Sequence, residues 1–232
     1  MDNCPNCNSR SGVDTKGRDF CHACSKDFPG NRRDIMKVKE ESRGLEIPED
    51  LKESYPQESI RYLIRYFNTA DEACRLTDCF WSSKYQRLCF PYVGSKHLTQ
   101  DKRILGCWMR SLKEDVKAKW LYAGDRNICW LLGDCQNNDK VVVVVEDVIS
   151  AIKVSQVLPC ICLGGTKIND RTRDVIDSNF KRVVLFLDGD EAGRTASQKL
   201  NRELVLLNDT RQIRTKKDPK DYDIDELKEI LL

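Results

Sequence analysis

The sequence predicts an α/β fold with a mostly parallel sheet in its C-terminal part, preceded by a small α+β region and a short cysteine-containing module. Apolar strands and amphipathic helices alternate from residue 139 onward, as in parallel sheets. The middle region combines helical periodicity with short apolar runs typical of antiparallel strands. Four cysteines in two close pairs lie near the start of the chain. We therefore expect four parts: residues 1–28, a linker at 29–46, and domains at 47–138 and 139–232.

Composition places the chain among ordinary globular proteins. It has 232 residues, of which 40% are hydrophobic, and a formal net charge of +2. No apolar run approaches the ~20 residues that cross a bilayer, and the first residues do not resemble a secretory signal. We expect a cytoplasmic protein with reduced thiols and no membrane partner. Eight of the twelve cysteines lie mostly in apolar surroundings and are expected to be small buried hydrophobes.

The remaining four cysteines have the spacing of a zinc site. Cys4 and Cys7 form one CxxC pair, and Cys21 and Cys24 form a second pair thirteen residues later. Two such pairs complete a tetrahedral shell of four thiolates, which leaves no open position for catalysis. The sequence therefore predicts a structural zinc ribbon. Its basic loop residues suit phosphate contacts, and a ribbon used only for protein contacts is the alternative.

The middle region predicts two helices and then a small antiparallel sheet. Helical periodicity runs through residues 57–80, and Thr69 with Glu72 forms a capping box for the second helix. Strands are expected at residues 88–93 and 103–110, with a further apolar piece at 120–122.

Charge is distributed unevenly along the chain. Residues 84–126 carry ten basic and four acidic residues, a net charge of +6, whereas residues 136–232 have a net charge of −1. A basic segment beside an acid-centred one suits a polyanion held near a metal site. A solvated basic face is the alternative interpretation.

The C-terminal region alternates regularly between strands and helices. Its strands are expected at residues 141–145, 159–163, 182–187 and 210–214, and its helices at 147–157, 169–179, 193–207 and in a last segment ending at Leu232. Strands that are apolar almost throughout are buried on both faces. We therefore expect helices on both sides of this sheet.

Acidic residues follow three of these strands. Glu146 follows the first, Asp188 and Asp190 follow the third, and Asp218 comes after the fourth. In open α/β sheets the ligand site lies beyond the carboxyl ends of the strands. Carboxylates there suit Mg²⁺, although an Asp-x-Asp alone is often only a helix cap. An EF-hand is excluded because Lys199 occupies its twelfth position, and the chain has no Walker loop.

These acids resemble those of the TOPRIM domain. That domain is shared by DnaG-type primases, type IA and II topoisomerases, OLD-type nucleases and RecR-type proteins. The resemblance implies that Glu146, Asp188 and Asp190 are catalytic, and that together with Asp218 they hold Mg²⁺ or Mn²⁺.

Further segments resemble primases in particular, and they occur in the primase order. They are Arg87–Pro91, Gly106–Arg110, Lys119–Leu121, Lys217–Asp221 and the N-terminal cysteine ribbon. The resemblance is greatest to short bacteriophage primases or to the primase half of phage helicase–primases. One departure is Ser150, where primases usually carry an aspartate. Asp147 beside the glutamate is expected to point elsewhere.

The resemblance implies a DNA-directed RNA polymerase that makes short primers on single-stranded DNA from ribonucleoside triphosphates by two-metal nucleotidyl transfer. Arg87, Arg110, Lys117 and Lys119 would bind nucleotide and template, and the zinc ribbon would contact the template. A replicative helicase is the expected partner because the sequence has no motor domain, and a phage protein would act in the host cytoplasm. A RecR-like DNA-binding protein and a TOPRIM nuclease remain alternatives.

Overall fold

The computed structural model describes residues 12–13, 19–21, 26–28, 45–49, 51–52, 55–93, 104–134, 140–206 and 208–232. The chain divides into two units, one formed by residues 1–45 with 115–118 and the other by 46–114 with 119–232. In the first unit, β1 (Gly12–Val13), β2 (Asp19–Cys21) and β3 (Lys26–Phe28) form an antiparallel sheet. Cys4, Cys7 and Cys24 lie outside the described residues, and Cys21 is described only as part of β2. The zinc site therefore stays a prediction.

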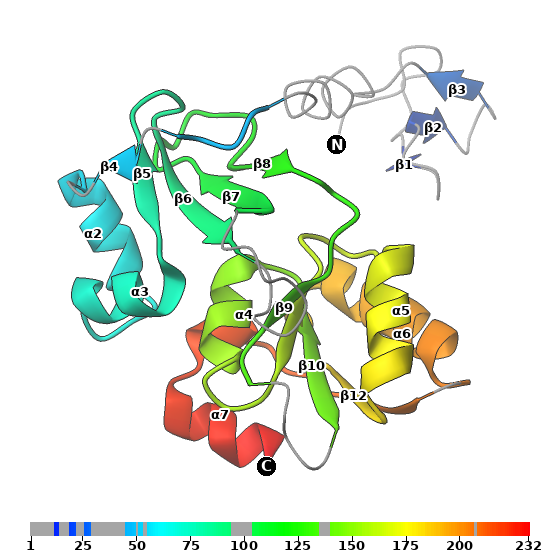
Figure 1. The fold of residues 1–232 in the computed structure, drawn as a ribbon. Helices are drawn as coiled ribbons and strands as arrows, with labels where there is room; N and C mark the ends of the chain where they lie inside the picture. Colours follow the sequence, from blue (N-terminus) through cyan, green and yellow to red (C-terminus); the bar gives the residue numbers. More distant parts are fainter. Residues whose placement is uncertain are drawn as a thin grey trace. The chain divides into compact units, whose positions relative to one another are not determined.

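The larger unit begins with an antiparallel sheet whose strands pair in sequence order (Figure 1). The strands are β4 (Leu51–Lys52), β5 (Phe80–Ser82), β6 (Arg87–Tyr92), β7 (Gly106–Arg110) and β8 (Trp120–Gly124). Two helices accompany them, α2 (Gln57–Leu63) and α3 (Ala70–Thr77). The Thr69 hydroxyl caps α3 by accepting the Glu72 N–H at 3.0 Å. The Glu72 carboxylate accepts from Asn68 N–H at 2.9 Å, one residue before the position that a capping box uses.

The second sheet of this unit is mostly parallel, as the sequence predicts. Its order is β13 (Asp209–Gln212), β12 (Arg182–Leu185), β10 (Val141–Val145), β11 (Cys160–Cys162) and β9 (Trp130–Leu132). The first four strands run parallel, and β9 pairs antiparallel with β11. Strand β9 was not predicted from the sequence. It lies inside the segment expected to end at residue 138 but belongs to this sheet.

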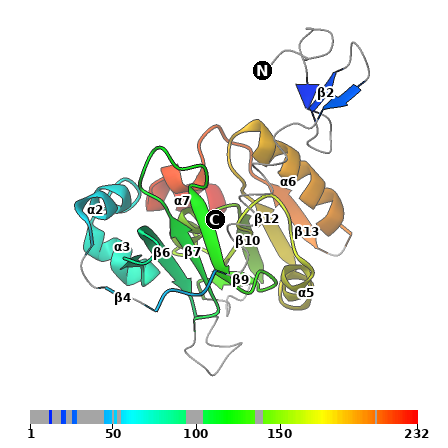
Figure 2. The same ribbon diagram turned by 90° about the horizontal axis from the view of Figure 1, so that it is seen from above.

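Helices cover both faces of the second sheet (Figure 2). Val141, Val143 and Val145 pack in one apolar cluster with α4 (Val148–Val154) and α7 (Ile224–Leu231). Val142 and Val144 face the opposite cluster, with α5 (Asp170–Asn179) and α6 (Glu191–Leu204). Successive side chains of a strand point to opposite faces, so the valine run supplies both clusters. None of the helices that the structure describes is long and apolar enough to cross a membrane.

Aromatic side chains join the two sheets of the larger unit. Tyr92 of β6 stacks on Trp130 of β9 with ring centroids 4.7 Å apart, and the Tyr92 hydroxyl accepts the Leu131 N–H at 3.3 Å. Trp108 of β7 lies against the loop after β11, where a Cβ on Gly164 would come 2.0 Å from its ring. Glycine is therefore required at this position by close approach as well as by its φ of +63°.

We predict that Gly164→Ala destabilises the protein by about 2 kcal/mol or more, because the methyl group strains a left-handed residue and displaces a packed indole. Urea unfolding monitored by circular dichroism measures the loss. Gln198→Ala introduces the same residue on the exposed side of α6 and should change the free energy of unfolding by about 0.5 kcal/mol or less. Equal stabilities of the Gly164 variant and the wild type would contradict this account of the contact between the sheets.

Candidate active site

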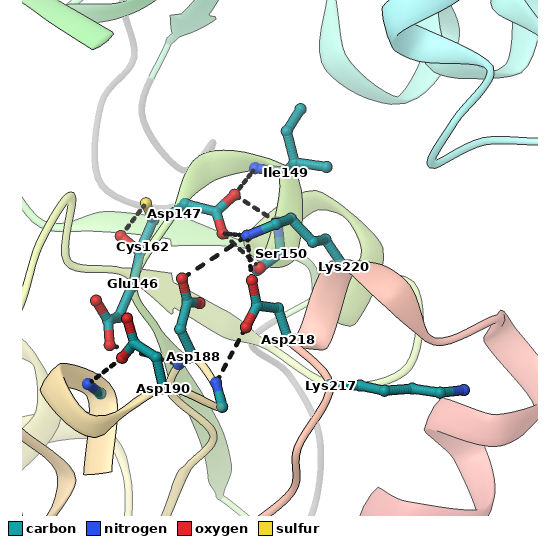
Figure 3. A network of polar contacts seen from close by, with 12 residues as sticks. Glu146, Asp147, Ile149, Ser150, Cys162, Asp188, Asp190, Lys217, Asp218 and Lys220 are labelled. Atoms are coloured by element: carbon teal, nitrogen blue, oxygen red, sulfur yellow. Dashed lines mark hydrogen bonds and ion pairs between the residues drawn. The ribbon is translucent and has the colours of Figure 1, made fainter. Parts of the chain in front are cut away.

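Carboxylates converge at one edge of the parallel sheet. Glu146 directly follows β10, Asp188 comes shortly after β12, and Asp218 lies in the segment after β13. Since these strands are parallel neighbours, their carboxyl ends meet at the same edge. Figure 3 shows the three predicted positions together with Asp190, as the sequence predicts, and with two residues that were not predicted there, Asp147 and Lys220.

Lys220 lies at the centre of one half of this cluster (Figure 3). Its Nζ is 2.8 Å from Asp218 Oδ2, 3.1 Å from Asp147 Oδ2 and 3.7 Å from Asp188 Oδ2. Burial opposes the charge of Lys220, but Asp147 and the other two carboxylates raise its pKa well above the usual range. Burial likewise works against the Asp218 carboxylate, yet hydrogen bonds from Lys220 and from the Gly189 N–H lower its pKa. The ammonium therefore stays charged and paired.

The other half of the cluster holds Glu146 and Asp190, whose carboxylates lie side by side in Figure 3. Burial and the neighbouring Asp188 raise the pKa of Glu146 to about 7, and burial raises the pKa of Asp188 to about 6. Asp190 caps α6 by accepting the Gly193 N–H at 2.7 Å. A Cβ on Gly193 would lie 2.8 Å from Glu146 Oε1, so glycine lets the helix approach the acids. This half carries excess negative charge.

The residues of the cluster fit a divalent cation in donor chemistry. Asp188 Oδ1 is buried and has no hydrogen-bond partner among the described residues, which is the state expected of an oxygen reserved for a ligand. Carboxylate oxygens are the donors that Mg²⁺ and Mn²⁺ prefer. Within the described ranges, however, no three acidic, histidine or cysteine side chains are grouped so that they could hold a metal ion. Binding would therefore require the side chains to draw together.

Asp147 was expected from the sequence to point away from the acidic cluster, and this expectation was wrong. The Asp147 side chain faces the cluster and pairs with Lys220. Its Oδ1 caps α4 by accepting the N–H groups of Ile149 and Ser150. Its Oδ2 accepts the Ser150 hydroxyl at 2.7 Å and the Lys220 ammonium at 3.1 Å. An aspartate directly before a predicted helix is an N-cap signal, and that signal could have indicated the cap that Asp147 forms.

A cleft of about 340 Å³ connects the acids to the antiparallel sheet. Glu146, Asp147, Asp188 and Lys220 are on one side, and the other side consists of Tyr62, Tyr66, Trp108, Arg110 and Trp120. The Arg110 guanidinium is 5.4 Å from the Tyr62 ring centroid and 5.2 Å from that of Trp120. Its Nε is buried and unbonded among the described atoms. Pockets of about 300–1,000 Å³ suit small-molecule ligands.

The other predicted binding residues lie elsewhere. Arg87 donates from Nη1 to the carbonyls of Lys119 at 3.2 Å and Met109 at 3.5 Å, so it fastens β8 and β7. The Lys119 side chain is exposed, and neither residue belongs to the lining of the cleft. Lys117 belongs to the other unit. Arg110 was predicted from the sequence, but the aromatic rings around it were not.

Comparisons with known proteins bear on the fold. Residues 143–225 match a family model described as Toprim-like, and no curated protein matches the sequence. A structure of the DnaG primase catalytic domain bound to ssDNA matches with a TM-score of 0.59 and 15% identity, over 85% of this chain and 77% of that one. The Aquifex aeolicus primase (zinc binding and RNA polymerase domains) matches with a TM-score of 0.51 and 17% identity, over 87% of this chain and 55% of that one.

A DNA primase domain from Pseudomonas aeruginosa matches with a TM-score of 0.48 and 19% identity, over 64% of this chain and 53% of that one. The chain thus spans about half the length of the Aquifex and Pseudomonas chains. The Toprim-like match and the DnaG structure support the α/β TOPRIM fold that was expected from the sequence. The sheet is mixed because the unpredicted β9 pairs antiparallel with β11.

We predict that Glu146→Gln stabilises the protein at pH 8 in metal-free buffer. Because the pKa of Glu146 is higher in the folded state, ionisation of this group costs stability as pH rises from about 4.5 to about 7. A tenfold change in proton affinity between the folded and unfolded states corresponds to about 1.4 kcal/mol. Solvent screening at this half-buried side chain reduces the total gain to about 1–2 kcal/mol.

Urea unfolding at pH 8 and pH 5 measures this effect, and the gain should shrink at the lower pH. Glu229→Gln on the exposed side of α7 is the matched control, with an expected change of about 0.5 kcal/mol or less. A Glu146→Gln variant that is less stable than the wild type at pH 8 would show that the ionised Glu146 carboxylate does not destabilise the folded state.

Proposed function

We propose that the chain is a DNA primase, an enzyme that synthesises short RNA primers on a single-stranded DNA template. One observation carries the proposal. The carboxylates at the edge of the parallel sheet face, across a single cleft, an arginine held between two aromatic rings. A negative, ion-binding side and a positive, phosphate-binding side are the two parts that nucleotidyl transfer requires.

Each side of the cleft has a defined task in this reaction. A primer 3′-hydroxyl oxygen forms a bond to the α-phosphorus of the incoming ribonucleotide, the bond to pyrophosphate breaks, and the hydroxyl proton is lost to solvent. Glu146, Asp188 and Asp190, with Asp218, would hold Mg²⁺ or Mn²⁺, which supplies Lewis-acid activation of the attacking oxygen and charge stabilisation. Arg110 would bind the triphosphate, since packing between Tyr62 and Trp120 restricts its guanidinium.

Template binding and recruitment extend the proposal beyond the cleft. The excess of basic residues between positions 84 and 126, including Arg87, Lys117 and Lys119, suits a polyanionic strand. The N-terminal cysteines would hold zinc and contact the template. Three further parts of the proposal rest on the sequence resemblance. They are a replicative helicase as partner, action in the cytoplasm (of the host if the protein is phage-encoded), and closeness to bacteriophage primases. Co-purification with a helicase would test the partnership.

We predict that the purified chain makes short RNA from single-stranded DNA, four ribonucleotides (one of them labelled) and Mg²⁺ or Mn²⁺, as resolved on a denaturing gel. Asp188→Asn should lower the rate at least about 100-fold, equivalent to roughly 3 kcal/mol of transition-state stabilisation. The substitution preserves shape but removes a charge that borders both halves of the cluster. Asp225→Asn, in which the same change falls on a side chain that is 88% exposed, should leave the rate unchanged.

Other products in the same tube separate the alternatives. Shortened DNA would identify a nuclease, and DNA binding without any product would favour a RecR-like protein. Full activity of the Asp188 variant would contradict the assignment of the acids.

We predict one zinc ion per chain in the protein as isolated, measured by elemental analysis. Cys24→Ser should lose it, because three thiolates and a hydroxyl bind zinc poorly. Cys74→Ser, outside the paired cysteines, should retain it. The Cys24 variant should also initiate poorly on a specific template while binding nucleotide normally. Equal losses in both measurements would argue against a template-contacting ribbon.

A further inference from the structure

Lys220 has the surroundings of a bound cation rather than those of a surface lysine. Its side chain is 19% exposed and its ammonium contacts one oxygen from each of three carboxylates, Asp147, Asp188 and Asp218. These acids come from three different segments of the chain, which follow β10, β12 and β13. A group that draws carboxylates together from three segments does what a metal ion does in an acidic cluster.

The backbone beneath Lys220 holds the ammonium in place. Buried Lys153 of α4 donates from Nζ to the carbonyl oxygens of Lys220 and Tyr222. Pro219 is buried and begins the 3₁₀ turn Pro219–Asp221 that carries the lysine. By contrast, Lys217 in the same segment points away from the network (Figure 3) and pairs with Glu226 at 3.3 Å. The placement of Lys220 is therefore a property of the folded chain rather than a chance orientation.

Position 150 adds no charge to this half of the cluster. The Ser150 side chain is fully buried, and its hydroxyl donates to Asp147 Oδ2, the oxygen that also meets Lys220. A serine can orient that carboxylate but cannot serve as a further anionic ligand for a divalent ion. The side chains that donate to Asp147 Oδ2 are thus the Lys220 ammonium and the neutral Ser150 hydroxyl.

The Asp188 carboxylate divides the cluster into two halves. Its Oδ2 faces Lys220, whereas its Oδ1 is buried without a partner in the part of the chain that the structure describes. Glu146 and Asp190 lie on the other side, and no ion pair joins either to a lysine or arginine of the described residues. Positive charge is therefore supplied to one half and lacking in the other.

We propose that the Lys220 ammonium permanently takes one of the two cation positions, so that the cluster binds one divalent ion, at Glu146, Asp188 Oδ1 and Asp190. The part of the inference that concerns the divalent ion rests on the proposed function. Two-metal chemistry uses two positive centres beside the attacking and leaving oxygens. In this chain the second centre would be a tethered ammonium, which donates hydrogen bonds to phosphate oxygens.

Counting bound Mn²⁺ by electron paramagnetic resonance on the intact chain tests the inference without any activity assay. We expect one tightly bound ion per wild-type chain, after subtraction of the ions bound by Asp188→Asn under the same conditions. Lys220→Met keeps the length of the side chain, removes the charge and should bind two ions. Lys217→Met makes the same change on the lysine that points away and should still bind one.

Each outcome decides the matter. Two ions in the wild type, or one ion in both the wild type and Lys220→Met, would overturn the role of Lys220 and leave the primase proposal standing. No specific ion in any variant would overturn the divalent site, and with it the proposed function. If Lys220→Met fails to fold, Lys220→Gln removes the same charge, keeps a polar side chain and all three carboxylates, and should likewise gain the second ion.

Discussion

Repulsion between carboxylates at the edge of the parallel sheet is the constraint on which the rest of the site depends. Parallel pairing of β10 and β12 brings Glu146 and Asp188 to the same edge. Burial raises the pKa of both carboxyls, and the charge of Asp188 raises that of Glu146 further. Lys220 offsets this charge on one side only. The remaining side is left with an unpaired oxygen on Asp188, among the residues that the structure describes, and is prepared for a positively charged ligand.

The edge of the parallel sheet forms a cleft because a second sheet packs beside it. Aromatic stacking of Tyr92 on Trp130 and the fit of Trp108 against Gly164 hold the antiparallel sheet beside the parallel one. This packing places Arg110 in the same cleft as the acids. The positive and negative sides therefore come from different sheets, and packing between the sheets, rather than the motif itself, sets their separation.

The chemistry of the cleft is shared by several kinds of enzyme, and the acids alone do not distinguish among them. Carboxylates at a sheet edge suit polymerases, nucleases and topoisomerases equally. Arg110 adds a second feature, because the planar guanidinium beside Tyr62 and Trp120 suits the recognition of phosphate oxygens. The proposed primer synthesis therefore rests on the acids and Arg110 lining the same cleft, and not on the acids alone.

The sequence by itself determined the alternation of strands and helices, the burial of the valine run and the edge at which Glu146, Asp188 and Asp218 meet. These features follow from local periodicity and from the geometry of parallel strands. It also placed the Thr69 cap, which depends on neighbours only three residues apart. Strand β9 was not predicted because three residues are too few to show the alternation of apolar and polar side chains that indicates a strand. Only the tertiary structure decided that Asp147 faces the acids, that Lys220 enters them, and that Arg110 lies between two rings. Asp147 and Lys220 are 73 residues apart, and such a contact is set by how whole segments pack rather than by any local pattern.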